Sequence, residues 1–206
     1  MRKLQTERGA RRCSEMLDAA FEVFLERGYA GASVDAVVER AGGSKETLYS
    51  HFGSKAGLLK AIIEQRAEGL TAAFDVPADD THSDAFLTKI AIGYLDLVLN
   101  PRGLALFRLV VAEAGRMPEV GDILFRTGPE ALANRLAARL RRWEARGDIK
   151  VADPDRAAVV FFAMVRGDLH LRALLNPTRM PTAAEIERHA AFVVNRFLKM
   201  CDYRPG

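Results

Sequence analysis

The sequence predicts an all-α protein in which a small N-terminal helical domain precedes a larger C-terminal helical bundle domain. Apolar residues recur every three or four positions, which is the spacing of one face of a helix. In the first such segment they are Cys13, Leu17, Ala20 and Phe24. No pair of segments alternates apolar and polar residues as neighbouring strands do, and the signals between segments are those of helix ends.

Helix-end signals then divide the chain. Gly28 ends a first helix over 13–27, because glycine adopts the left-handed conformation at low cost. Prolines stand where the first turn of a later helix needs no backbone N–H, at Pro101, Pro129 and Pro154. Thr182 and Glu185 form a capping box before the last helix. Beyond residue 53, helices are expected over 54–74, 84–99, 101–115, 119–146, 154–175 and 183–201.

Residues 33–52 predict two short helices joined by a glycine-containing turn. Ser33 can cap the first helix, and Ser44 can cap the second, which buries Leu48 and Phe52. This is the pattern of a helix-turn-helix. The side chains left for solvent or a groove form hydrogen bonds readily: Ser44, Lys45, Thr47, Tyr49, Ser50 and His51. An ordinary helical hairpin with a polar surface fits the spacing equally well.

Charge and composition restrict the partners only weakly. The first 12 residues hold five basic residues and one acid, so this arm can neutralise phosphates, although basic arms also occur on proteins that bind no polyanion. The longest apolar run, 157–165, is too short to cross a membrane, and no signal region follows the N-terminal charges. Cys13 and Cys201 provide no disulfide framework, so a cytoplasmic location and no membrane partner are expected.

The detail of residues 10–59 separates the two interpretations of the short helices. The informative motifs are Leu17-Asp-Ala-Ala-Phe-Glu-Val-Phe, Arg27-Gly-Tyr, Ala41-Gly42, Ser44-Lys45-x-Thr47-Leu48-Tyr49-x-x-Phe52 and Ser54-Lys55. With this order and spacing, the segment resembles the DNA-binding domain of the TetR/AcrR family of bacterial transcriptional regulators. Phe107-Arg-Leu-Val-Val-Ala-Glu-Ala and the Arg146-Gly-Asp-Ile turn resemble, less specifically, one group of the family's C-terminal domains.

The resemblance implies a helix-turn-helix DNA-binding domain over 8–60 and an effector-binding and dimerisation domain over 61–206. It implies double-stranded operator DNA as a partner, contacted by Ser33, Ser44, Lys45, Thr47, Tyr49, Ser50, His51 and Lys55. Lys55 begins a helix whose N-terminal amides can hold a phosphate together with its ammonium. The sequence departs from the family pattern at Val38, where a small residue is usual, and at Gly43, where a branched apolar residue is usual.

The helix expected over 154–175 is apolar on two sides, so both sides should be buried. With the last helix it can form a four-helix bundle with a second copy, as the resemblance also implies, whereas a monomer core is the alternative. The residues expected at the homodimer interface are Val165, Leu169, Ile186, Ala190, Val193 and Phe197.

The C-terminal domain is expected to hold a small, mostly apolar effector in a pocket. Its candidate lining is Phe107, Trp143, Phe162, Met164 and Arg166, and packing or surface roles are the alternative for each. One helix also carries a basic stripe, which is either an anionic-effector site or a solvated face: Arg135, Arg139, Arg142 and Arg146.

Together these features predict a ligand-responsive DNA-binding regulator, specifically a repressor released from a palindromic operator. The sequence has no motif of an enzyme and suggests no catalytic residue and no cofactor. Asp79, Asp80 and His82 lack the spacing of metal ligands, so no metal is expected. The alternative is an all-α carrier or enzyme that retains the fold without binding an operator.

Overall fold

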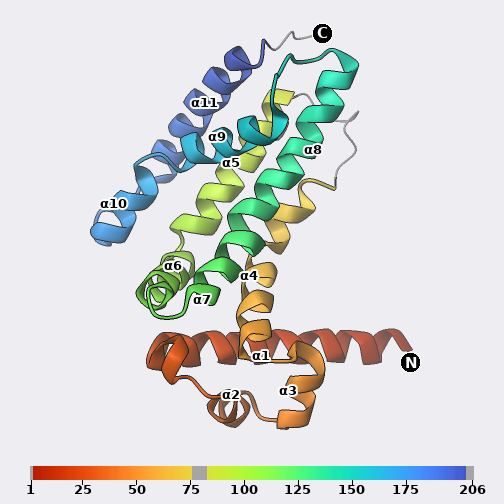
Figure 1. The fold of residues 1–206 in the computed structure, drawn as a ribbon, viewed down its shortest axis with the longest axis vertical. Coiled ribbons are helices and arrows are strands. Elements are labelled where there is room, and N and C mark those ends of the chain that lie inside the picture. The colour runs from red at the N-terminus through yellow and green to blue at the C-terminus, as the bar shows by residue number, and fades with distance from the viewer. Residues whose placement is uncertain (1, 76–82, 203–206) are drawn as a thin grey trace. The chain divides into compact units, whose positions relative to one another are not determined.

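The computed structural model describes residues 2–75 and 83–202, with side chains from Gly9 onward within those ranges. All regular secondary structure in the described ranges is helical (Figure 1). The predicted all-α class is therefore confirmed.

The chain forms two compact units, one of residues 1–66 with 105–127 and the other of 67–104 with 128–206. The helices of the first unit are α1 (Arg2–Gly31), α2 (Val34–Ala41), α3 (Lys45–Phe52), α7 (Pro118–Phe125) and parts of α4 (Lys55–Ala72) and α6 (Pro101–Ala114). Those of the second are α5 (Ser83–Leu99), α8 (Ala131–Arg146), α9 (Pro154–Arg166), α10 (Leu169–Leu175) and α11 (Ala183–Met200). The contribution of residues 105–127 to the first unit has no counterpart in the sequence prediction, and the functional division at residue 60 stays a prediction.

The core of the first unit fixes the position of α3. Leu48, the inward residue of this short helix, is fully buried together with Phe21, Phe24 and Leu58 from the flanking helices. Val110 of α6 belongs to the same core. An eight-residue helix is marginal on its own, so this apolar contact is what holds α3 in place.

In the second unit, α5 packs against α9, α10 and α11, and α8 packs against α9 (Figure 1). Aromatic side chains fill the space between them: Phe161 and Phe197 lie 4.9 Å apart, and Phe86 and Trp143 lie 5.5 Å apart, between ring centroids. Edge-to-face pairs of this kind add to the free energy gained from burial.

The same core contains most of the residues expected at a dimer interface. Five of the six are buried within this chain: Val165, Leu169, Ala190, Val193 and Phe197. The sixth, Ile186, is partly buried and packs against the same cluster. The five buried side chains are not available to a second copy, because the chain's own helices already cover the apolar faces that suggested an interface.

Two expected helices are interrupted. The helix predicted over 154–175 breaks at Gly167, whose backbone has φ of 48°, so that α9 and α10 are separate elements. The helix predicted over 119–146 is α7 followed by a π-helical segment, η2 (Arg126–Glu130), and then α8. Pro129 lies in η2 and has no N–H to donate, which disfavours the regular α-helical ladder there.

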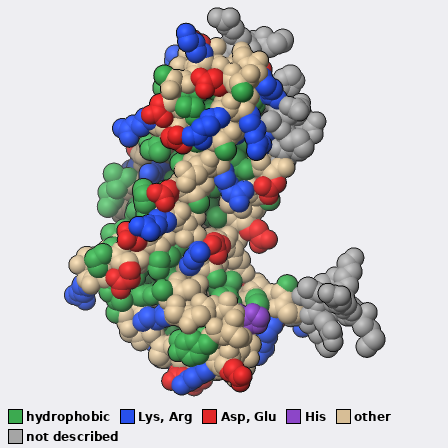
Figure 2. All heavy atoms as spheres, turned by 45° about the vertical axis from the view of Figure 1, so that its right-hand side comes forward, with side chains coloured by type: hydrophobic (Ala, Val, Ile, Leu, Met, Phe, Trp, Pro, Cys, Tyr) green, Lys and Arg blue, Asp and Glu red, His purple; other side chains and the backbone are tan. Residues whose placement is uncertain are grey.

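The surface carries charges of both signs, with hydrophobic side chains between them on the face that Figure 2 shows. Among the described residues, no helix is both long enough and apolar enough to cross a membrane.

Candidate nucleic-acid interface

The turn between α2 and α3 depends on two adjacent glycines. Gly42 has φ of 66° and Gly43 has φ of 127°, conformations that L side chains rarely adopt. Glycine at position 43, where the family usually has a branched apolar residue, therefore suits the positive φ of the backbone there. Val38, the other departure, is partly buried and packs against the core of the first unit.

Serine hydroxyls cap both helices of the motif. Ser33 Oγ accepts a hydrogen bond from the amide of Ala36 at 3.2 Å, and Ser44 Oγ accepts one from the amide of Thr47 at 3.1 Å. These caps satisfy amides at the helix N-termini and set where each helix begins. The positions of both caps are as predicted.

The outward face of α3 carries the polar side chains expected of a recognition helix. Tyr49 is 49% exposed, and Ser50 and His51 are exposed beside it. Ser50 Oγ donates to the carbonyl of Thr47 at 2.8 Å, whereas Thr47 Oγ1 lies 2.9 Å from Ser44 Oγ. This row of donors and acceptors, opposite the buried Leu48, is suited to the polar edges of bases and to phosphates.

Lys45 has an intramolecular partner in the first turn of α3. Its ammonium forms an ion pair with Asp35 of α2, and both side chains are more than half exposed. Exposed pairs contribute little free energy, so phosphate or a base can replace Asp35. The two residues lie ten positions apart in the sequence, a separation at which no local pattern predicts that they pair.

Lys55 lies at the start of α4, and its ammonium faces the C-terminal end of α1. It donates to the carbonyls of Tyr29 at 2.8 Å, Ala30 at 3.3 Å and Ala32 at 3.1 Å. It also lies 4.6 Å from the centroid of the Tyr29 ring. Burial raises the pKa of this tyrosine, and the carboxylate of Glu119 adds to the effect. The predicted phosphate contact of Lys55 thus competes with three hydrogen bonds inside the protein.

The basic arm has a role that the sequence did not indicate. Arg12 donates to the carbonyl of Gly42 and so ties α1 to the turn of the motif. Arg11 and Arg12 both form ion pairs with Glu15, at 3.5 and 3.8 Å. The contact between Arg12 and Gly42 joins residues 30 positions apart, so no local pattern could have revealed it.

The residues expected to line an effector pocket are divided between the two compact units, and their role stays a prediction. Phe107 belongs to the first unit, whereas the other four lie in the second. There, Phe162 contacts Tyr94 with ring centroids 5.0 Å apart. Burial raises the pKa of Tyr94, and the charge of Arg166 acts in the opposite direction. Met164 is partly buried against the same core.

Trp143 is fully buried, and its indole Nε1 has no hydrogen-bond partner among the described residues. A cavity of about 540 Å³ lies elsewhere in this unit, at the end of α10 and the start of α11. None of the five predicted residues lines this cavity. The residues that line it are Arg172, Leu175, Asn176, Arg179, Met180, Pro181 and Glu185.

The basic stripe of α8 is neither a uniformly solvated face nor a single cluster. Arg139 is buried and donates to the carbonyl of Phe74 at 3.1 Å, while Arg135 and Arg146 form ion pairs with nearby aspartates. Arg142 is exposed.

The remaining candidate sites are a metal site and the two cysteines. The described residues contain no group of three or more His, Cys, Asp and Glu side chains that could hold a metal, and residues 79, 80 and 82 lie outside them. Cys13 is partly buried. Cys201 is buried, and burial raises the pKa of its thiol to about 11, which disfavours the reactive thiolate.

Comparison with known sequences identifies both parts of the chain. A family profile described as "Bacterial regulatory proteins, tetR family" matches residues 16–62. A second, described as "AefR-like transcriptional repressor, C-terminal domain", matches residues 85–204, which is more than half of the chain. The HTH-type transcriptional regulator UidR of Escherichia coli (strain K12) is 31% identical over 159 residues, or 76% of this chain and 80% of UidR.

Solved structures give the same result. A TetR-family transcriptional regulator from Mesorhizobium loti superposes with a TM-score of 0.77 at 28% identity, covering 94% of this chain and 98% of that chain. The flavonoid-responsive regulator FrrA superposes with a TM-score of 0.73 at 33% identity, covering 93% and 97%. The resemblance inferred from the N-terminal motifs is confirmed: the chain belongs to the TetR family of bacterial transcriptional regulators and is a DNA-binding regulator.

Proposed function

We propose that this regulator is a homodimeric repressor that binds a palindromic operator and is released by a small, mostly apolar effector. The operator is double-stranded DNA contacted by α3 and by the start of α2. The residues proposed to contact it are Ser33, Ser44, Lys45, Thr47, Tyr49, Ser50 and His51.

The observation that carries the proposal is the arrangement of α3. Leu48 anchors the helix in the core, while the opposite face presents Lys45, Tyr49 and His51 to solvent. In helix-turn-helix proteins, the second helix enters the major groove with its N-terminal residues at the base edges. Lys45 is in the first turn, where it is placed to reach a base, and the other two are placed for bases or phosphates.

The aromatic interior of the second unit supports an aromatic effector. Tyr94, Phe161 and Phe162 form a continuous series of ring contacts there, at 5.0 and 5.4 Å between centroids. FrrA, which is 33% identical, responds to flavonoids according to its name. A flat, mostly apolar molecule that stacks on such rings is the class of effector that we propose.

Large apolar side chains that remain exposed on the surface of the single chain support the homodimer. Leu171 and Leu175 of α10 are 57% and 77% exposed, and Phe192 of α11 is 58% exposed. Leu171 and Leu175 are one helical turn apart, so they lie on one face of α10. A palindromic operator has two half-sites, which a dimer of readers matches.

Footprinting on the DNA immediately upstream of the gene tests the proposal. We expect protection of two inverted half-sites about one helical turn apart or a multiple of it, and loss of protection when an effector is added. A duplex of the same base composition in scrambled order is the control. Equal affinity for the two duplexes would favour the carrier or enzyme alternative instead.

A further inference from the structure

The cavity of about 540 Å³ at the end of α10 and the start of α11 belongs neither to the proposed operator contacts nor to the aromatic interior proposed for an effector. Its volume is that of a site for a small molecule, since such pockets enclose about 300–1,000 Å³. Every residue that lines it lies in the second unit. A single chain therefore forms the cavity, and ligand binding there can be measured whether or not the protein dimerises or binds an operator.

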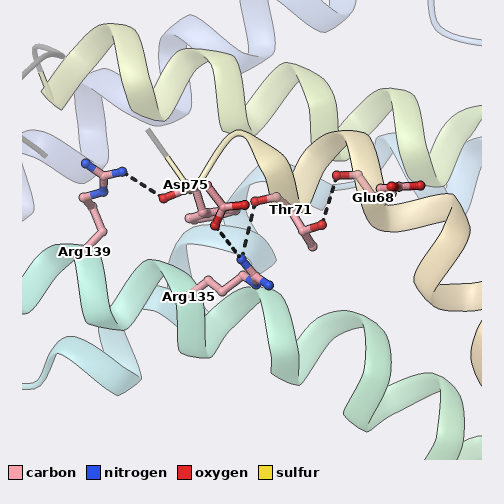
Figure 3. A network of polar contacts seen from close by, with 6 residues as sticks. Glu68, Thr71, Asp75, Arg135 and Arg139 are labelled. Carbon is pink, nitrogen blue, oxygen red and sulfur yellow. Dashed lines mark hydrogen bonds and ion pairs between the residues drawn. The ribbon is translucent and has the colours of Figure 1, made fainter. Parts of the chain in front are cut away.

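Arg179 lines the cavity with an exposed guanidinium that forms no hydrogen bond or ion pair with any described residue. Two other arginines of this unit are engaged inside the protein. Arg135 pairs with Asp75 at 3.3 Å, and Figure 3 shows its side chain and that of Arg139 projecting from α8 toward the end of α4. Arg139 donates to the carbonyl of Phe74 at 3.1 Å. In contrast, Arg179 keeps its five N–H donors for a partner from outside the described chain.

Two further side chains offer donors to the same cavity. Arg172 pairs through Nε with Asp168 at 3.0 Å, and both side chains are more than half exposed, so the pair contributes little free energy. The terminal nitrogens of its guanidinium remain for a ligand. Asn176 accepts a hydrogen bond from Thr178 at Oδ1, at 2.7 Å, which leaves the two N–H groups of Nδ2.

Glu185 supplies the only negative charge among the residues that line the cavity. Its carboxylate accepts hydrogen bonds from the amide of Thr182 at 2.8 Å and from the hydroxyl of Thr182 at 3.1 Å. These bonds, the one from the amide above all, lower the pKa of Glu185, so the carboxylate is ionised at neutral pH. The lining thus carries two positive charges and one negative charge, and it favours an anion.

The rest of the wall is apolar. Leu175 is 77% exposed and Met180 is 38% exposed, and Pro181 lies beside them in the lining. Leu175 also lies on the face of α10 proposed for the second copy, so the cavity borders that face. A ligand with one charged group and one apolar group matches this wall, because arginine binds carboxylates through paired N–H groups and an apolar tail removes exposed apolar area from water.

We propose that this cavity binds an amphiphilic carboxylate, whose head group is held by the donors and whose tail covers the apolar wall. The donors are Arg172, Arg179 and Asn176. The apolar wall is formed by Leu175, Met180 and Pro181. This site is separate from the rings of Tyr94, Phe161 and Phe162, none of which lines the cavity.

The first test compares four small molecules by calorimetric titration of the full-length protein. Octanoate carries both the carboxylate and a tail, and it is expected to bind saturably. Acetate lacks the tail, octan-1-ol lacks the charge and octylammonium reverses the charge, so each should bind on the order of tenfold more weakly or less. Octan-1-ol that binds as tightly as octanoate would show that the arginines hold no head group, and it would overturn the proposal.

Variants then locate the binding. Arg179→Gln should weaken octanoate binding on the order of tenfold, because a charge-assisted contact to the carboxylate is lost. Arg142→Gln, which removes the same charge at an exposed position of α8 outside the cavity, is the matched control. Glu185→Gln should instead strengthen octanoate binding severalfold. It removes the negative charge from the lining, while glutamine can still complete the capping box with Thr182.

Circular dichroism establishes that each variant is folded before its octanoate affinity is compared with that of the wild type. Opposite changes in Arg179→Gln and Glu185→Gln, with no change in Arg142→Gln, would support the site. The proposal is overturned if the wild type shows no saturable octanoate binding, or if Arg179→Gln and Glu185→Gln both bind octanoate as the wild type does. None of these measurements uses DNA, so failure of the proposed operator binding is a separate result.

Discussion

At the residue scale, the pairing of Lys45 with Asp35 sets up a competition between the protein and DNA. Asp35→Asn removes both the competing partner and a negative charge near the expected position of phosphates. We expect operator affinity to rise severalfold, with the largest gain at low salt. Glu39→Gln, on the exposed side of the same helix, is the matched control. Reduced affinity of the Asn variant would mean that Asp35 is needed to orient Lys45.

Lys45 itself is the residue expected to read a base. Lys45→Ala should remove about 1–3 kcal/mol of discrimination at one position in each half-site. The measurement compares affinities for the operator and for scrambled DNA across a salt titration. Equal weakening on both duplexes would assign Lys45 to phosphate, and no change on either would show that α3 is not the reading helix.

The pairing of Glu26 with Arg40 should make the stability of the first unit depend on pH. Two hydrogen bonds, at 2.8 and 2.6 Å, join the Arg40 guanidinium to the Glu26 carboxylate. They lower the pKa of Glu26 from its ordinary value of 4.5. The contribution to stability is therefore present above pH 4.5 and is lost as the pH falls through the lower folded-state pKa.

Glu26→Gln should abolish this contribution, so the difference in unfolding free energy between wild type and variant should shrink as the solution is acidified below pH 4.5. Urea unfolding at a series of pH values measures it. Glu22→Gln, an exposed acid one turn earlier on α1, serves as the comparison. If the difference in unfolding free energy between wild type and Glu26→Gln stays constant with pH, the substitution acts through packing and not through the charge of Glu26.

At the scale of elements, the break between α9 and α10 requires glycine. Gly167 has φ of 48°, and a Cβ there would lie 3.0 Å from Cε1 of His189. This histidine donates from Nε2 to the carbonyls of Met164 and Val165, so it is not free to move aside. Gly167→Ala should destabilise the protein by about 1–3 kcal/mol.

Gly69→Ala is the matched control for Gly167→Ala. Gly69 lies inside α4 and is exposed, and a Cβ there would contact nothing within 4 Å. The same substitution should therefore stabilise this helix by about 0.5–1 kcal/mol. Thermal or urea unfolding checks both variants, and changes of the same sign would contradict the argument.

Elements with local signals were predictable from the sequence. Ser33, Ser44 and Thr182 cap helices where expected, because capping depends on residues three positions apart. The breaks at Gly167 and in η2 were not predicted, since a helix tolerates an isolated glycine and Pro129 also fits a helix start. The DNA-contacting residues stay a prediction, and the long-range contacts around them could not be predicted: Lys55 and Arg12 donate to carbonyls more than 20 residues away.

At the scale of the whole molecule, the periodicity of apolar residues predicted which helix faces are buried. It did not predict whether the same chain or a second copy covers them. Val193 and Phe197 lie one helical turn apart, a spacing that suggested a dimer interface. Both are buried in the core of the second unit. Leu175, which stands in no long apolar run, is 77% exposed. An apolar residue at a helix end, left uncovered by its own chain, is a better indication of a partner surface than regular spacing is.

This distinction gives a test of the homodimer. Leu175→Asp places a charge on a side chain that solvent already reaches, so the fold should survive while a dimer that covers α10 dissociates. Phe197→Glu instead buries a charge in the core, so it should unfold the second unit at a cost of more than about 3 kcal/mol. Sedimentation and thermal unfolding together separate these outcomes.

Val159→Asp is the control for surface charge, since Val159 is an exposed apolar residue of α9 outside the proposed interface. The expected pattern is a dimeric wild type, a folded monomer for Leu175→Asp and a folded dimer for Val159→Asp. The monomer should also bind the operator more weakly, because each copy then engages a single half-site and loses the gain in effective concentration. A dimer that survives Leu175→Asp but not Val159→Asp would place the interface on α9. If the wild type is a monomer in solution and still protects two half-sites, the dimer does not form before DNA binding. The two copies would then assemble on the DNA.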